Sequence, residues 1–91
     1  MDPRANRTDA IRDRLQQRFA PQELEVRDDS ALHIGHANEG RGHFSVRIIA
    51  SQFSSLGRVE RHRMVYAALG DLMQDQIHAL SIAAFAPEDI H

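Results

Sequence analysis

The sequence of 91 residues contains no cysteine, no lysine and no long apolar run. Without cysteine, the chain has no disulfides, thiol nucleophiles or thiolate metal ligands. Its apolar stretches are shorter than the roughly 20 residues of a membrane-spanning helix, and the N-terminal segment MDPRANRTDA lacks the apolar core of a secretory signal. We therefore expect a soluble protein of the cytoplasm that has no membrane as a partner.

The charge balance is slightly acidic, with thirteen acidic residues, eleven basic residues and a net charge of −2. This balance argues against a strongly basic domain of the kind that binds nucleic acid without sequence preference. Every basic residue is arginine, whose planar guanidinium group suits phosphate and carboxylate. Seven arginines fall into two groups, with Arg4, Arg7, Arg12 and Arg14 in the first and Arg58, Arg61 and Arg63 in the second. Each group is either a solvated helix face or a local anion-binding patch.

The length permits one compact domain with a modest core. We expect residues 1–7 to form a flexible N-terminal arm and residues 8–91 to form the domain. Thr8 is the predicted N-cap of a first helix, since Ile11, Leu15 and Phe19 then recur on one helical face until Pro21 ends it.

Two segments with alternating apolar residues follow this helix. Residues 22–28 and residues 43–50 are predicted to be strands, the second with Phe44, Val46 and Ile48 on one face. The polar, glycine-containing stretch between them has no periodicity, so we interpret it as a long connection.

The second half of the sequence predicts four further features. The segment SQFSSLG is a turn region with a short helical turn that buries Phe53 and Leu56, and a helix, the longest in the chain, runs from Arg58 to about Gln74. Residues 77–84 form a strand that is apolar on both faces, and Pro87 begins a short final helix. The predicted apolar face of the long helix consists of Val59, Val65, Tyr66, Leu69, Leu72 and Met73.

The element order is thus α-β-β-α-α-β. A helical crossover between strands favours parallel pairing of the second and third strands, with the first strand antiparallel to the second. We therefore predict an α+β fold in which helices cover one face of a three-stranded mixed sheet.

Histidine is concentrated in the connection LHIGHANEGRGHF, which carries His33, His36 and His43. From the residues alone, this segment is a metal-ligating loop, a phosphate contact or a solvated polar connection. His78 begins the third strand, where a side chain is held rigidly yet reaches the surface. A neutral imidazole can bind iron or zinc, but a histidine packed beside Leu80 and Ile82 is the alternative.

Three segments together resemble the BolA family: LEVRDDSALHIGH, RVERHRMVY and IHALSIAAFAPED. The resemblance extends from about Ile11 to Asp89. It implies a class II KH-like fold, a regulatory role and a monothiol glutaredoxin as partner. It also implies that a [2Fe-2S] cluster bridges the two proteins, held by glutaredoxin cysteine and glutathione on one side and by histidine of this chain on the other. We expect the isolated chain to be a monomer without a cofactor.

The resemblance assigns the first cluster ligand to His78, within IHAL, and the second to His33 or to its competitor His36. His43 is expected to point away from Phe44 and to act as a supporting polar group. A zinc or nickel contact through His33 and His36 alone is the weaker alternative, because structural zinc sites take four ligands.

The segment RVERHR offers a second candidate function, that of a DNA-binding transcriptional regulator. It would use a helix-turn-helix region from Phe53 to Arg63, with Arg58, Arg61 and Arg63 contacting phosphates. The same arginines could receive the carboxylates of glutathione, or simply be solvated. The chain has only Gly57 where KH modules use a Gly-x-x-Gly clamp, and no catalytic pattern occurs, so we do not expect an enzyme.

Overall fold

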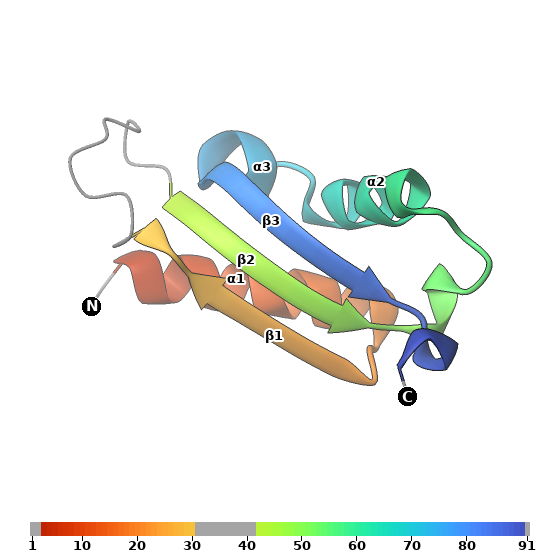
Figure 1. The fold of residues 1–91 in the computed structure, drawn as a ribbon. Coiled ribbons are helices and arrows are strands. Elements are labelled where there is room, and N and C mark those ends of the chain that lie inside the picture. Colours follow the sequence, from red (N-terminus) through yellow and green to blue (C-terminus); the bar gives the residue numbers. More distant parts are fainter. Residues whose placement is uncertain (1–2, 31–41, 91) are drawn as a thin grey trace.

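The computed structural model describes residues 3–30 and 42–90 (Figure 1). Its elements confirm the predicted α+β class and the order of helices and strands. In chain order they are α1 (Pro3–Phe19), β1 (Glu23–Asp28), β2 (Gly42–Ile49), the short helix η2 (Ser51–Phe53), α2 (Arg58–Leu69), α3 (Leu72–Asp75), β3 (Ile77–Phe85) and the final turn η3 (Pro87–Asp89).

The sheet has the strand order β1-β2-β3, so β2 is central and the other two strands form the edges. β1 pairs with β2 in antiparallel orientation, which sets Val26 opposite Val46. β3 pairs with β2 in parallel orientation, which sets Ile82 opposite the same Val46. Both predicted pairings are therefore confirmed.

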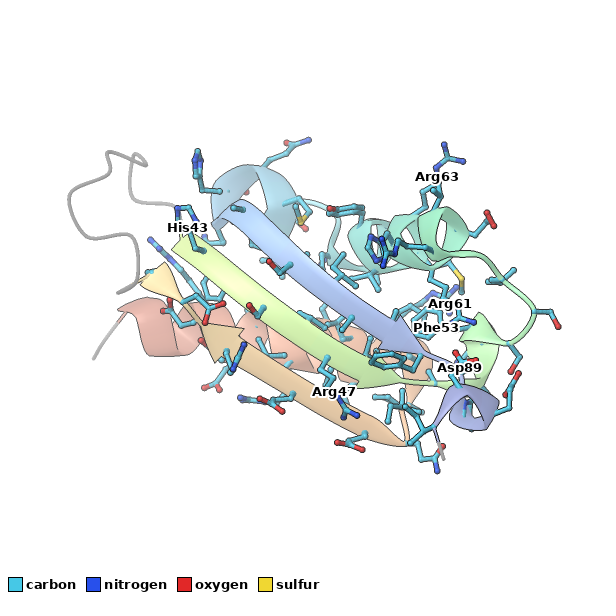
Figure 2. The ribbon with its side chains drawn as sticks, viewed as in Figure 1. His43, Arg47, Phe53, Arg61, Arg63 and Asp89 are labelled. Atoms are coloured by element: carbon cyan, nitrogen blue, oxygen red, sulfur yellow. The ribbon has the colours of Figure 1, made fainter. Side chains whose placement is uncertain are left out.

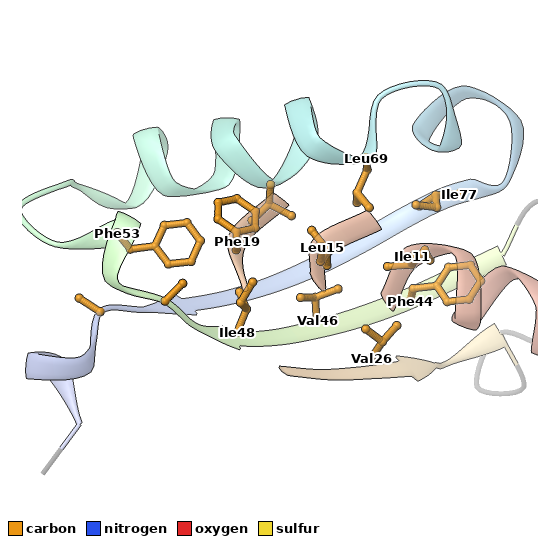
Figure 3. Packing of buried hydrophobic residues seen from close by; sticks show 13 residues of the cluster. Ile11, Leu15, Phe19, Val26, Phe44, Val46, Ile48, Phe53, Leu69 and Ile77 are labelled. Carbon is orange, nitrogen blue, oxygen red and sulfur yellow. The ribbon is translucent and has the colours of Figure 1, made fainter. Parts of the chain in front are cut away.

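The core lies between the sheet and the helices, which cover one face (Figure 3). The predicted helical stripe of Ile11, Leu15 and Phe19 is buried, and the inward-facing residues of β2 and the side chain of Phe53 pack against it. Burying each such side chain contributes roughly 1.5–3 kcal/mol. The main buried residues are Ile11, Leu15, Phe19, Val26, Phe44, Val46, Ile48, Phe53, Val65, Leu69 and Ile77.

α1 begins at Pro3, so the prediction of Thr8 as N-cap is wrong and Thr8 lies within the helix. Proline is tolerated in a first helical turn, where its missing N–H has no intrahelical partner to lose. Alanine and arginine in the same segment favour the helical state. The expected arm therefore overlaps α1 in residues 3–7, and its flexibility stays a prediction.

The predicted helix from Arg58 to Gln74 is interrupted, because α2 ends at Leu69 and α3 begins at Leu72. Gly70 adopts a positive φ of 51°, which residues with a Cβ rarely adopt. The guanidinium of Arg14 in α1 donates a hydrogen bond of 2.9 Å to the carbonyl of Leu69 and so takes one of the free acceptors at the helix end. α1, with 17 residues, is consequently the longest helix, not α2, with 12 residues.

Two residues of the predicted apolar face of α2 are exposed, namely Val59 at 57% and Tyr66 at 41%. Val65 and Leu69, one turn apart, are the buried residues of this helix. Leu56 is only partly buried beside the fully buried Phe53. β3 is parallel to β2 as expected, but no described element covers the sheet face away from the helices, where Ala79, Ser81 and Ala83 are exposed.

Candidate metal centre

β3 begins with an irregularity in its pairing with β2. Gly42 lies opposite Ile77, but His43 lies opposite Ala79, so His78 is an additional residue on β3. Such a β-bulge leaves the additional residue outside the regular ladder and redirects its side chain. Ile77 is buried and His78 is exposed, so the alternative of a histidine packed in the core does not apply.

The bulge brings His78 against His43 at the beginning of β2. The two imidazole rings have centroids 5.1 Å apart and planes inclined by 61°. His43 is partly buried and precedes the buried Phe44 on β2, so the two side chains lie on opposite faces of the strand, as predicted. Figure 2 shows His43 at the amino end of β2. The site therefore combines one partly fixed imidazole with one exposed imidazole.

The backbone around His43 is held by a polar corner at the end of β1. The amide of His43 donates to the hydroxyl of Ser30 at 3.1 Å, and its carbonyl accepts from the amide of Asp29 at 2.7 Å. The amide of Ser30 in turn donates to the carboxylate of Asp28 at 2.8 Å, and the hydroxyl of Ser45 donates to the carboxylate of Asp29. These bonds fix the position from which the His43 side chain extends.

Gly42 completes this corner because a side chain would not fit there. A Cβ at residue 42 would lie 2.7 Å from the ring of Phe44 and 2.9 Å from the hydroxyl oxygen of Ser30. The close approach of strand, ring and hydroxyl thus depends on glycine directly before His43.

Two neighbouring imidazoles can share one metal ion. At metal–nitrogen distances of about 2.1 Å, two nitrogens on a tetrahedral ion are roughly 3.4 Å apart. Rings with centroids 5.1 Å apart can reach that separation through side-chain rotation, most easily that of the exposed His78. Two histidines can also replace two thiolates on one iron of a [2Fe-2S] cluster.

In residues 3–30 and 42–90, no group of three or more histidine or acidic side chains could hold a metal ion. Any metal bound by the pair would therefore need further ligands from outside this described region. His33 and His36, the predicted candidates for the second ligand, lie outside the described residues. The sequence predicted only a supporting role for His43 and did not indicate that its ring contacts that of His78.

The arginines of α2 differ in their surroundings. Arg61, with 15% of its side chain exposed, donates from Nε to the carbonyl of Leu56 at 2.9 Å. Its Nη1 donates to the carbonyl of Ala84 at 3.0 Å and to the carboxylate of Asp89 at 2.7 Å. Arg61 thus joins α2, β3 and η3, and its Nε and Nη1 donors are engaged within the chain rather than free for phosphate.

Arg58 and Arg63 are exposed, and neither forms a salt bridge with another described residue. Figure 2 shows Arg63 pointing away from the body of the domain. Of the three arginines predicted to contact nucleic acid, these two remain accessible. In the described ranges, no helix is long and apolar enough to cross a membrane.

A family model described as BolA-like protein matches residues 15–89. A relative from Arabidopsis thaliana, SufE-like protein 1, chloroplastic/mitochondrial, is 39% identical over 87 residues, which cover 88% of this chain but only 24% of that protein. The DNA-binding transcriptional regulator BolA of Haemophilus influenzae is 34% identical over 80 residues, covering 87% of this chain and 76% of the relative.

The fold is similar to solved structures of the same kind. The BolA domain of SufE1 from Arabidopsis thaliana has a TM-score of 0.84 and 38% sequence identity, and the match covers 99% of both chains. The similarity therefore includes nearly all of this chain but only part of the longer plant protein.

Proposed function

The chain belongs to the BolA-like family, and from this premise we propose that it is a regulatory adaptor that binds a monothiol glutaredoxin. Together the two proteins would hold a [2Fe-2S] cluster, with this chain contributing histidine and the partner contributing cysteine and glutathione. The contact between His43 and His78 is the observation that carries this proposal, since it joins two possible ligands of one metal. Iron homeostasis or cluster trafficking would be the setting.

The donor atoms available in the chain fit this role. With no cysteine, the chain cannot hold a cluster through thiolates, but imidazole nitrogens can replace thiolates on one iron. When bound, such a cluster supplies one-electron redox chemistry and iron and sulfide that can be transferred. His78 would be the first ligand, and its exposure leaves it accessible to a partner.

His43 is the second ligand that the geometry supports best, because the hydrogen bonds of Ser30 and Asp29 fix its backbone. His33 and His36 stay candidates for this role. Ligation requires deprotonated imidazole, so cluster binding should weaken in acid. We expect the isolated chain to be a monomer without a cluster and to act in the cytoplasm, although one plant relative is named for chloroplasts and mitochondria.

The test is a titration of cluster-loaded monothiol glutaredoxin with this chain, followed by visible circular dichroism. The wild-type chain should convert the spectrum to that of a mixed complex, and His78→Ala should abolish the conversion. His43→Ala should give an altered or less stable complex, whereas the control His62→Ala, on α2, should behave like wild type. A wild-type spectrum from His78→Ala would contradict the ligand assignment.

Single His33→Ala and His36→Ala variants in the same titration identify the second ligand. If one of them gives the altered or less stable complex expected for His43→Ala, while His43→Ala retains the wild-type spectrum, the second ligand lies in the connection before β2. The function would then stand and the role of His43 would be wrong.

A second candidate is a DNA-binding transcriptional regulator, which is favoured by the name of the Haemophilus relative and by the exposure of Arg58 and Arg63. Binding to a promoter duplex should then weaken steeply with salt and on neutralising these two arginines. Affinity that responds to neither change would exclude this function. Arg61 is unsuitable for this test because its removal would also disturb the fold.

A further inference from the structure

The outer edge of β3 pairs with no other strand in the described part of the chain, since β3 contacts only β2 within the sheet. The carbonyl of Phe85 accepts a hydrogen bond from the amide of Ala50 on the β2 side, and the carbonyl of Ala84 faces the opposite side, where Arg61 contacts it. Backbone groups alternate between the two sides of a strand. The amides and carbonyls of Leu80 and Ile82 therefore point away from β2, on the same side of β3 as the carbonyl of Ala84.

The two edge strands of the sheet differ in how strongly their side chains discourage the addition of a further strand. β1 carries Glu23, Glu25, Arg27 and Asp28 among its six residues, and charged side chains discourage the addition of a further strand. β3, with nine residues, has no acidic residue and no arginine. Its outward-facing side chains on the open sheet face, Ala79, Ser81 and Ala83, are small and exposed.

Beside the C-terminal half of β3 lies a groove of about 500 Å³, lined by Ile82–Phe85 and by Arg58, Arg61 and His62 of α2. The acidic groups around it are already engaged. Asp89 binds Arg61 and the amide of Ala86, the carboxylate of Glu60 accepts from the amide of Gly57, and that of Glu88 accepts from the hydroxyl of Ser54.

Arg58, in contrast, lines the groove and has no carboxylate partner among the described residues. Arg63, five residues further along α2, does not line the groove, but it is likewise exposed and forms no salt bridge in that same part of the chain. The groove and the adjoining outer edge of β3 thus combine outward-facing backbone groups with an arginine, Arg58, that forms no salt bridge with a described residue.

We propose that the outer edge of β3 binds an extended acidic peptide segment of a protein partner by strand addition, with backbone bonds to Leu80 and Ile82 and a carboxylate directed to Arg58. Strand addition obtains affinity from main-chain bonds and specificity from alternate side chains. Arg61 sets the limit of the site, because its bond to the carbonyl of Ala84 occupies the last outward acceptor of the strand.

Other occupants match these features less well. Duplex DNA would use the arginines but not the backbone groups of β3, and the net charge of −2 gives it little general attraction. A second copy of this chain would offer its own β3, which has no carboxylate for Arg58. This binding goes beyond the proposed cluster site and does not need His78.

The test measures fluorescence anisotropy of a labelled synthetic peptide of alternating valine and glutamate, added to the full chain. This peptide should bind, while the counterpart with lysine in place of glutamate should bind about tenfold more weakly or worse. A version with methylated backbone nitrogens should not bind, because strand addition needs the amide donors. Bound peptide should also protect the amides of Leu80 and Ile82 from hydrogen exchange.

Variants of exposed residues keep the fold intact while testing the charge. Arg58→Glu should lower the affinity about tenfold, and the matched reversal Arg27→Glu on the opposite edge should leave it within twofold. His78→Ala should bind the peptide like wild type, which separates this site from the cluster proposal. Equal binding of the lysine peptide, protection of β1 instead of β3, or displacement of the peptide by duplex DNA would each overturn the proposal.

Discussion

The imidazole of His43 lies against the imidazole of His78, with ring centroids 5.1 Å apart, although the two residues are 35 positions apart in the sequence. Parallel pairing brings the beginnings of β2 and β3 together, and the bulge at His78 turns its side chain out of the ladder. The contact thus results from the parallel pairing of β2 with β3 and from the additional residue, His78, at the beginning of β3.

Replacing Gly42 by alanine should destabilise the chain and disturb this contact. The new Cβ would lie 2.7 Å from the Phe44 ring and 2.9 Å from the Ser30 hydroxyl oxygen. Because a buried ring and a strand must shift, the free energy of unfolding should fall by about 1–3 kcal/mol, measured by urea denaturation. The control Gly57→Ala places its Cβ 3.2 Å from a flexible Glu60 carboxylate at an exposed site and should cost less. Equal losses in the two variants would contradict the close packing at Gly42.

Arg61→Ala should lower the free energy of unfolding by about 2–3 kcal/mol. It removes the donor for the carbonyls of Leu56 and Ala84 and the partner of Asp89, and bonds from charged donors in partly buried positions are strong. Arg61→Lys should recover only part of the loss, because an ammonium group cannot reproduce the guanidinium fork. Thermal or urea unfolding measures both. Arg63→Ala, at an exposed position on the same helix, should stay within about 0.5 kcal/mol of wild type.

Gly70→Ala distinguishes an interrupted helix from a continuous one. At the observed φ of 51°, alanine is strained, so the variant should lose about 1 kcal/mol of stability or more. In a continuous helix, the same change would stabilise the chain by a similar amount. A calorimetric comparison of Gly70→Ala with wild type shows whether the stability falls or rises. An increase in melting temperature would contradict the break between α2 and α3.

Local periodicity was sufficient to predict most of the fold. The spacing of Ile11, Leu15 and Phe19 identifies α1, and the alternation of Phe44, Val46 and Ile48 identifies the central strand, because these patterns express which side faces the core. The strand order then follows from the crossover rule.

The break at Gly70 could not be predicted in this way, since it also depends on Arg14, whose guanidinium contacts Leu69 from 55 positions away. The exposure of Val59 and Tyr66 has a similar cause, because packing against the sheet, not helical spacing, decides which residues of α2 are buried.

The candidate site was predictable only in part. His78 was identified by resemblance, and its exposure agrees with an accessible role. The proximity of His43 requires the register of β2 against β3 and the bulge between them, neither of which local pattern contains. Once Val46 is known to lie opposite Ile82, the parallel register places His43 and His78 at the same end of the sheet.

Pulsed electron paramagnetic resonance of the reduced mixed complex tests the cluster proposal most directly. With nitrogen-15 in the histidines of this chain only, the cluster should show couplings from two imidazole nitrogens. One should remain in His43→Gln, and both should remain in the control His62→Gln. The absence of nitrogen-15 coupling in the wild-type complex would contradict ligation by this chain, and unchanged coupling in His43→Gln would contradict the pairing of His43 with His78 as ligands.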